Sequence, residues 1–197
     1  MIDIKELKAR PIYGYLKWLT LAQAAAFQGW TALYTNFAVE AARVSGPENG
    51  IIQSIREVPG LLTIGVVALL LYFKEATLSS ASIVLCGIGV AATGWFPSFS
   101  GLIFWTLVLS FGFHYFEAIN QSLTLRHFEL IEAPLVISRL RAFTALGSLA
   151  MGLAIVAFSG LDYRILFGLA GAVAIVAGAW SIFRRPSEAN LPPQRRG

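Results

Sequence analysis

The sequence predicts an all-α membrane protein, a polytopic bundle of six transmembrane helices with both ends of the chain in the cytoplasm. Three observations predict it: a chain of 197 residues that is 56% hydrophobic and only 13% charged, six apolar segments, and a one-sided distribution of basic residues. A soluble domain of this size carries roughly a quarter charged residues. The missing charge therefore indicates a surface that faces lipid.

Six segments reach the length of about 20 mostly apolar residues that a membrane-crossing helix needs. They are residues 15–37, 51–73, 79–96, 99–125, 140–159 and 163–183. Their continuous hydrophobicity is typical of helices and not of barrel strands, which alternate apolar with polar residues. We divide the chain into a cytoplasmic leader (1–14) without a cleavable signal, a six-helix transmembrane domain (15–185) and a Pro-rich cytoplasmic tail (186–197) that we expect to be disordered.

The basic residues fall mostly on one side of this six-span plan. Because cytoplasmic loops are enriched in Lys and Arg, the richer side marks the cytoplasm. Three basic residues lie on the other side: Arg43, Arg56 and Arg164. The twelve on the cytoplasmic side are Lys5, Lys8, Arg10, Lys17, Lys74, Arg126, Arg139, Arg141, Arg184, Arg185, Arg195 and Arg196.

Composition also excludes several classes of function. The net charge is +4, but the basic residues form no dense face, so we expect no nucleic-acid partner. Two histidines and the single Cys86, widely spaced, give no metal-ligand pattern and no disulfide. No nucleophile–base pair or phosphate-binding loop appears, so we expect neither an enzyme nor a cofactor.

The fourth segment holds the most informative polar cluster. At 3.6 residues per turn His114, Glu117 and Gln121 share one face, and Asn120 lies beside them. An ionisable group inside the bilayer is costly unless it faces a partner or water, so Glu117 and His114 are candidates for substrate contact or proton coupling. The alternative is a network of hydrogen bonds that fixes this helix to its neighbours.

The first segment carries a looser polar stripe that includes Gln23, Gln28 and Thr31. Gln28 and Thr31 are weaker substrate-contact candidates, because uncharged polar residues often bond across helices instead. We expect Trp18, Trp30 and Tyr34 to anchor the membrane interfaces.

Arg56 and Glu57 stand near the expected outer end of the second segment, where either could gate an external entrance or cap the bundle. Adjacent residues point about 100° apart on a helix, so we do not expect these two to pair with each other. Pro59-Gly60 is expected to loosen the helix. Small residues at Gly147 and Gly168 open small-xxx-small patterns that predict close helix contact.

Several stretches resemble the amino-terminal six-helix half of a bacterial major facilitator superfamily transporter. They are residues 33–40 (LYTNFAVE), 54–60 (SIREVPG), 94–98 (GWFPS) and 111–117 (FGFHYFE). The resemblance covers the chain up to about Arg185. It departs from the family between the second and third segments, where only Lys74 and Glu75 stand in place of the family's Gly-x-x-x-Asp-Arg-x-Gly-Arg-Arg-like pattern.

The resemblance implies a secondary transporter in the bacterial inner membrane that moves a small solute by alternating access. Because a complete member has two such halves, it also implies a second six-helix half, either a separate chain or a second copy. The alternatives are a non-transporting membrane scaffold or assembly partner and, with less support, an intramembrane enzyme.

Overall fold

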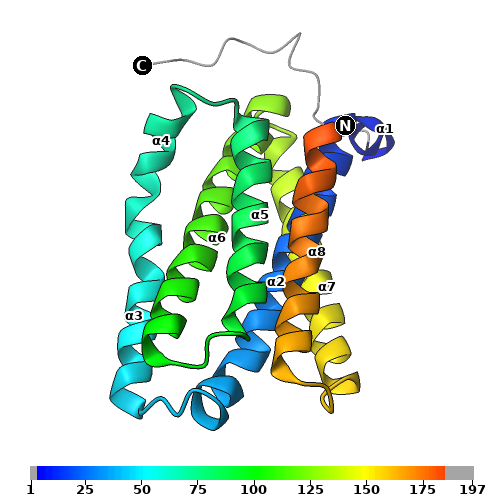
Figure 1. Cartoon of the computed structure of the whole chain (residues 1–197). Helices are drawn as coiled ribbons and strands as arrows, with labels where there is room; N and C mark the ends of the chain where they lie inside the picture. The colour runs from blue at the N-terminus through cyan, green and yellow to red at the C-terminus, as the bar shows by residue number, and fades with distance from the viewer. Residues whose placement is uncertain (1–3, 185–197) are drawn as a thin grey trace.

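Eight α-helices and one 3₁₀ turn follow one another along the chain (Figure 1). The computed structural model describes residues 4–184, and within them it contains helices and no strand. Residues 1–3 and the predicted tail 186–197 lie outside the described residues. The elements are α1 Ile4–Ala9, α2 Pro11–Glu40, α3 Gly46–Leu61, η1 Leu62–Ile64, α4 Gly65–Leu70, α5 Glu75–Thr93, α6 Phe99–His127, α7 Ala133–Ala157 and α8 Tyr163–Phe183.

Five of the described helices are long and apolar enough to cross a membrane: Gly46–Leu70, Glu75–Thr93, Phe99–His127, Ala133–Ala157 and Tyr163–Phe183. The all-α prediction is confirmed, and these helices support a membrane-embedded chain. The 30-residue α2 lies among them but is not one of the five. The six-span count therefore stays a prediction.

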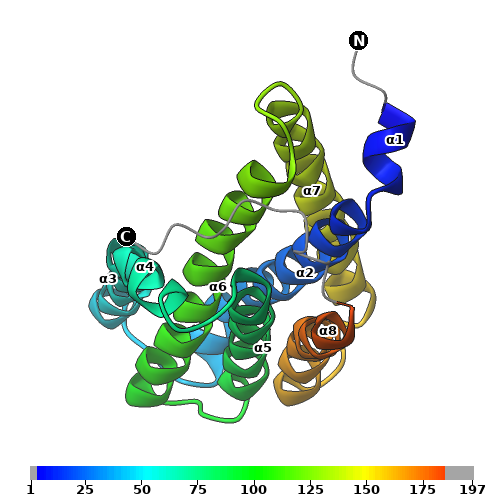
Figure 2. The ribbon, with the colours of Figure 1, turned by 90° about the horizontal axis from the view of Figure 1, so that it is seen from above.

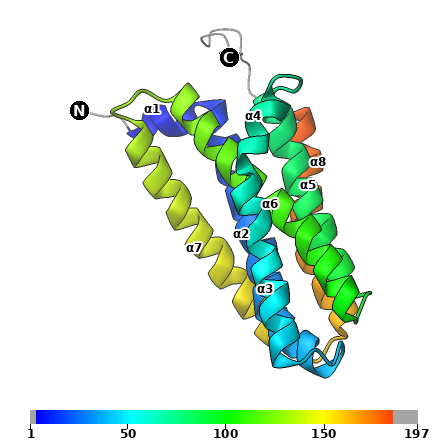
Figure 3. The ribbon, with the colours of Figure 1, turned by 90° about the vertical axis from the view of Figure 1, so that its left-hand side faces the viewer.

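The long helices run alternately up and down, so that α1 and the last turn of α8 lie at the same end of the bundle (Figure 1). Seen from that end, α3–α4 and α7 are the outer members of the bundle (Figure 2). Packing follows the order α3, α6, α5, α8, α2 and α7, and each helix has its main contacts with its neighbours in this order. α6 and α7 meet near their connecting turn and then diverge (Figure 3). Side chains of α2, α6 and α7 together line two cavities between these helices.

Local sequence explains where α3 begins and where it is distorted. Ser45 and Glu48 form a capping box, so α3 begins at Gly46, five residues before the expected start. Pro59 lies inside α3, and the helix tightens into η1 only two residues after Gly60. Proline lacks the N–H that an α-helix needs and crowds the preceding turn, which accounts for the predicted loosening.

Glycines bring the central helices into close contact. A Cβ on Gly171 in α8 would collide with the backbone of Gly87 and Ala91 in α5. Gly147 likewise lies against the backbone of α2. Gly168, which we expected in such a contact, faces open space, so that part of the small-residue prediction is wrong.

Trp30 and Tyr34 are core residues, with 1% and 2% of their surfaces exposed. Their rings stack on each other with centroids 4.5 Å apart. The interface-anchor prediction is therefore wrong for both, because they occupy the face of α2 that packs into the bundle.

Candidate functional site

The polar residues of α6 lie on two sides of the helix, one facing α3 and the other facing α2 and α7. His114 lies against α3, whereas Glu117, Asn120 and Gln121 line cavities shared with α2 and α7. The predicted common face of His114, Glu117 and Gln121 is thus only partly realised. His114 and Glu117 are about 60° apart around the helix axis, and a different helix packs on each side.

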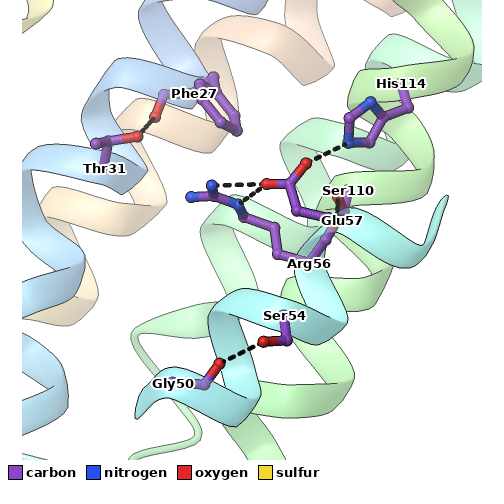
Figure 4. A network of polar contacts seen from close by, with 8 residues as sticks. All are labelled: Phe27, Thr31, Gly50, Ser54, Arg56, Glu57, Ser110 and His114. Atoms are coloured by element: carbon purple, nitrogen blue, oxygen red, sulfur yellow. Dashed lines mark hydrogen bonds and ion pairs between the residues drawn. The ribbon is translucent and has the colours of Figure 1, made fainter. Parts of the chain in front are cut away.

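Arg56, Glu57 and His114 form a charged cluster between α3 and α6, which we call the α3–α6 cluster (Figure 4). Arg56 donates from Nε and Nη2 to Glu57 Oε1 at 3.0 and 2.7 Å. Glu57 Oε2 lies 3.9 Å from His114 Nε2. The guanidinium also lies over the ring of Trp30, 6.0 Å from its centroid, so the cluster reaches α2.

The structure contradicts the expectation that Arg56 and Glu57 do not pair with each other. Their Cα–Cβ bonds do diverge, but the long arginine side chain bends back and brings its guanidinium to the neighbouring carboxylate. The angle of about 100° between adjacent residues on a helix gives the direction in which a side chain starts, but a long side chain such as arginine can end elsewhere.

The α3–α6 cluster lies near mid-depth of the helices instead of near an outer end. Arg56 is the eleventh of the 25 residues in Gly46–Leu70, about 15 Å along the helix from its first residue. His114 is the sixteenth of the 29 residues of α6. A hydrocarbon core is about 30 Å thick, so helices that cross it with their ends at its two surfaces would carry these charges near its centre.

Gly60 allows His114 to approach α3. A Cβ at residue 60 would lie 3.0 Å from His114 Cε1, and one at Gly65 would lie 2.8 Å from the Tyr115 hydroxyl. Ser110 adds a hydrogen bond from its hydroxyl to the carbonyl oxygen of Arg56. The sequence Pro59-Gly60 thus serves close contact with α6 as well as local distortion.

The second candidate region is the cleft between α2, α6 and α7. It contains a cavity of about 350 Å³ and a neighbouring one of about 110 Å³. Glu117 of α6 and Arg141 and Thr144 of α7 line both cavities. A carboxylate and a guanidinium therefore face the same space from opposite helices.

Two buried amide groups that line the cleft lack a hydrogen-bond partner on one atom. Gln23 is 1% exposed, and its Nε2 has no partner within the described residues. Asn120 is 9% exposed, and it donates from Nδ2 to Thr20 Oγ1 at 3.3 Å while its Oδ1 accepts no hydrogen bond there. A buried polar atom without a partner costs free energy, so such atoms deserve an explanation.

Sequence reasoning missed the contribution of α7. Arg141 was counted only as a cytoplasmic charge, yet it heads the stripe Arg141, Thr144 and Ser148 on one face of α7. This spacing of three and four residues could have revealed a polar helix face. The predicted candidates Gln28 and Thr31 line neither cavity; Thr31 donates to the carbonyl of Phe27.

An ion pair fixes α5 to α6 at the α1 end of the bundle. Glu75 is 3% exposed and accepts hydrogen bonds from Ser122 Oγ at 2.6 Å and Arg126 Nη1 at 3.0 Å. Lys74 and Glu75 are the two charges at the place where major facilitator superfamily proteins carry their loop pattern. Glu75 of this pair makes a contact between helices.

Other chemistry is sparse in the part of the chain that the structure describes. Residues 4–184 contain no group of three or more His, Cys, Asp or Glu side chains able to hold a metal ion. A larger groove of about 1010 Å³ between α2, α7 and α8 is almost wholly apolar, with Trp18 and Trp180 among its lining residues. Apolar grooves of this kind suit lipid chains more than polar solutes.

The fold and the two polar regions define an α-helical, membrane-embedded protein with charged groups on helices that are apolar enough to cross a membrane. No family model matches the chain, and no curated protein matches it.

Proposed function

We propose that this chain is one half of a secondary transporter that carries a small solute across the bacterial inner membrane by alternating access. The observation that supports it most is the pair of charged regions, the α3–α6 cluster and the Glu117–Arg141 cleft, within helices apolar enough to span a membrane. Ionisable groups at this depth are expensive and typically mark a substrate or ion pathway.

The least buried helices support a second six-helix unit. Only 17% of the apolar window of Gly46–Leu70 and 11% of that of Ala133–Ala157 are buried, against 39–56% for α5, α6 and α8. These two helices are the outer members beside α2 and α6, where a second half would close a cavity. That half is either a separate chain or a second copy of this one.

The α3–α6 cluster supports a role in coupling or gating. Protonation of His114 or Glu57 changes the charge that Arg56 experiences. Arg56 contacts α2, Glu57 contacts α6, and His114 contacts α3. Such a change shifts the balance between two arrangements of α3 against α6. Glu117 is the second coupling candidate, because Arg141 is the only cation among residues 4–184 that lines its cavities.

Solute flux in proteoliposomes tests the proposal. The full chain, alone and together with any six-helix partner that co-purifies, is reconstituted and assayed by counterflow with a panel of labelled small solutes. We expect flux of at least one solute that Glu117→Gln abolishes or reduces at least about tenfold. The matched control is Arg139→Gln, because Arg139 lies two residues from Arg141 and lines neither cavity.

Absence of flux for every solute, with the chain folded and its partner present, contradicts transport. The scaffold alternative predicts that outcome together with a stable complex. Its support is the exposed apolar surface of the outer helices, including Leu61, Ile64 and Leu153 at 82%, 79% and 62% exposure.

A further inference from the structure

We propose that the cleft between α2, α6 and α7 binds a small zwitterionic solute with an apolar side chain, of the chemical class of the apolar α-amino acids. This inference rests on the proposed function, and it names the class of substrate. The juxtaposition of Glu117 and Arg141 across one cavity carries it, together with two unpartnered buried amides.

Glu117 and Arg141 present opposite charges without neutralising each other directly. The ion pairs within residues 4–184 include none between these two side chains, although both line both cavities. In an environment of low dielectric constant a singly charged ligand is attracted by one of them and repelled by the other. A neutral ligand leaves the two charges to interact only with each other, through space and without an ion-pair contact. A ligand with one cationic and one anionic group satisfies both.

The unpartnered amide atoms have the matching polarity. Gln23 Nε2 is a donor and lines the larger cavity with Arg141, where a carboxylate needs further donors. Asn120 Oδ1 is an acceptor and lines the smaller cavity with Glu117, where an ammonium group needs further acceptors. Both atoms are themselves buried, so a rotation of each side chain toward its cavity would bring them to a bound zwitterion and complete these hydrogen bonds.

Apart from the hydroxyl side chains of Thr144 and Ser148, the remaining wall of the larger cavity is apolar and aromatic. Phe27 and Phe113 stack with ring centroids 4.2 Å apart, and Ala24 lies beside them. The cavity volume of about 350 Å³ is at the lower end of the range for small-molecule sites. This space suits an apolar side chain, and it distinguishes the proposed ligand from a sugar or a small inorganic ion.

Equilibrium binding tests the inference independently of flux, since all these lining residues belong to this chain. The full chain in lipid nanodiscs is titrated with L-phenylalanine, and with 3-phenylpropanoate and 2-phenylethylamine, which keep only the anionic or only the cationic group. We expect L-phenylalanine to bind at least about tenfold more tightly than either analogue, because each charge-assisted contact contributes at least that factor.

Reciprocal variants separate a binding role from a structural one. Glu117→Gln should weaken the binding of L-phenylalanine at least about tenfold, while 3-phenylpropanoate binds as well as before or better. Arg141→Gln should also weaken the binding of L-phenylalanine, while 2-phenylethylamine binds as well as before or better. Arg139→Gln and Glu129→Gln, which lie outside both cavities, are the matched controls and should leave all affinities unchanged. Thermal unfolding of each variant verifies that it is folded.

The inference is overturned if the folded chain does not bind L-phenylalanine, or if either analogue binds as tightly. It is also overturned if the two variants weaken all three probes equally. Flux of a neutral or singly charged solute, without zwitterion binding, would leave the transport proposal standing and remove this one. Zwitterion binding with the reciprocal shifts, but without flux, would support this inference and contradict the transport proposal.

Discussion

Glu75 makes the most buried charged contact among the described residues, because it accepts hydrogen bonds from Ser122 and Arg126 while only 3% exposed. Glu75→Gln keeps the shape but removes the charge that the arginine faces. We expect it to destabilise the protein by about 1–3 kcal/mol, a fall in Tm of several degrees. Thermal unfolding in detergent measures it, with the exposed Glu129→Gln as control. An unchanged Tm would show that the pair contributes no net stability.

Arg10 and Glu132 give a pH-dependent contact outside the membrane spans. Two hydrogen bonds at 2.8 and 2.9 Å join them, and the Arg10 guanidinium holds the pKa of Glu132 below its ordinary value of 4.5. Because the folded-state pKa is lowered, the stabilisation is complete above the unfolded pKa and is lost as the pH falls through the folded one. Tm measured from about pH 7 to about pH 3 should fall less steeply for Glu132→Gln than for the parent. Parallel curves would refute this.

Some residue-level features could be predicted from sequence and others could not. The cost of charge in lipid singled out Glu117 and His114 without any coordinates. Arg141 was missed because positive-inside counting treats every arginine near a helix end as a sidedness marker. Which helix each side of α6 faces depends on packing order, and periodicity within one segment does not determine that order.

At the scale of single helices, the contact between α5 and α8 depends on glycine. We expect Gly171→Ala to destabilise the protein by about 1–3 kcal/mol, because the new methyl group would meet the backbone of Gly87 and Ala91. Gly168→Ala, one turn away on the same helix and facing open space, is the matched control. It should be neutral or stabilising by up to about 1 kcal/mol. Equal effects in the two variants would contradict the close contact.

The helix boundaries were largely predictable, and their differences have local causes. The expected segments 99–125 and 163–183 match α6 and α8 closely because Ser98 and Asp162 cap them. α3 begins earlier than expected because hydropathy does not register the Ser45–Glu48 capping box. That five-residue error alone moved Arg56 and Glu57 from mid-depth to an apparent outer end.

At the scale of the whole molecule, charge is distributed unequally between the two ends. Nine of the described Lys and Arg residues lie at or near the α1 end, two at the opposite end and Arg56 near mid-depth. The nine are Lys5, Lys8, Arg10, Lys17, Lys74, Arg126, Arg139, Arg141 and Arg184. This distribution supports cytoplasmic placement of the α1 end.

Labelling of single cysteines in intact cells tests sidedness and the span count together. In a Cys86→Ala background, we expect Ser45→Cys to react with a membrane-impermeant maleimide from outside. Lys8→Cys should react only after permeabilisation, because the 30-residue α2 separates the two positions (Figure 1). Reaction of both cysteines from the same side would mean that α2 does not cross the membrane, leaving five spans.

The packing order has a consequence for biosynthesis. α2 rests mainly on α7 and α8, and α5 rests on α8 as much as on α6, so both helices lack a principal neighbour until the last ones are made. At synthesis rates of about 5–20 residues per second, Gly87 waits several seconds for Gly171. During that interval the small-residue faces of the nascent helices are open to lipid or to a membrane chaperone. A ribosome stalled before α8 would therefore release a chain that quality control can distinguish from the finished bundle.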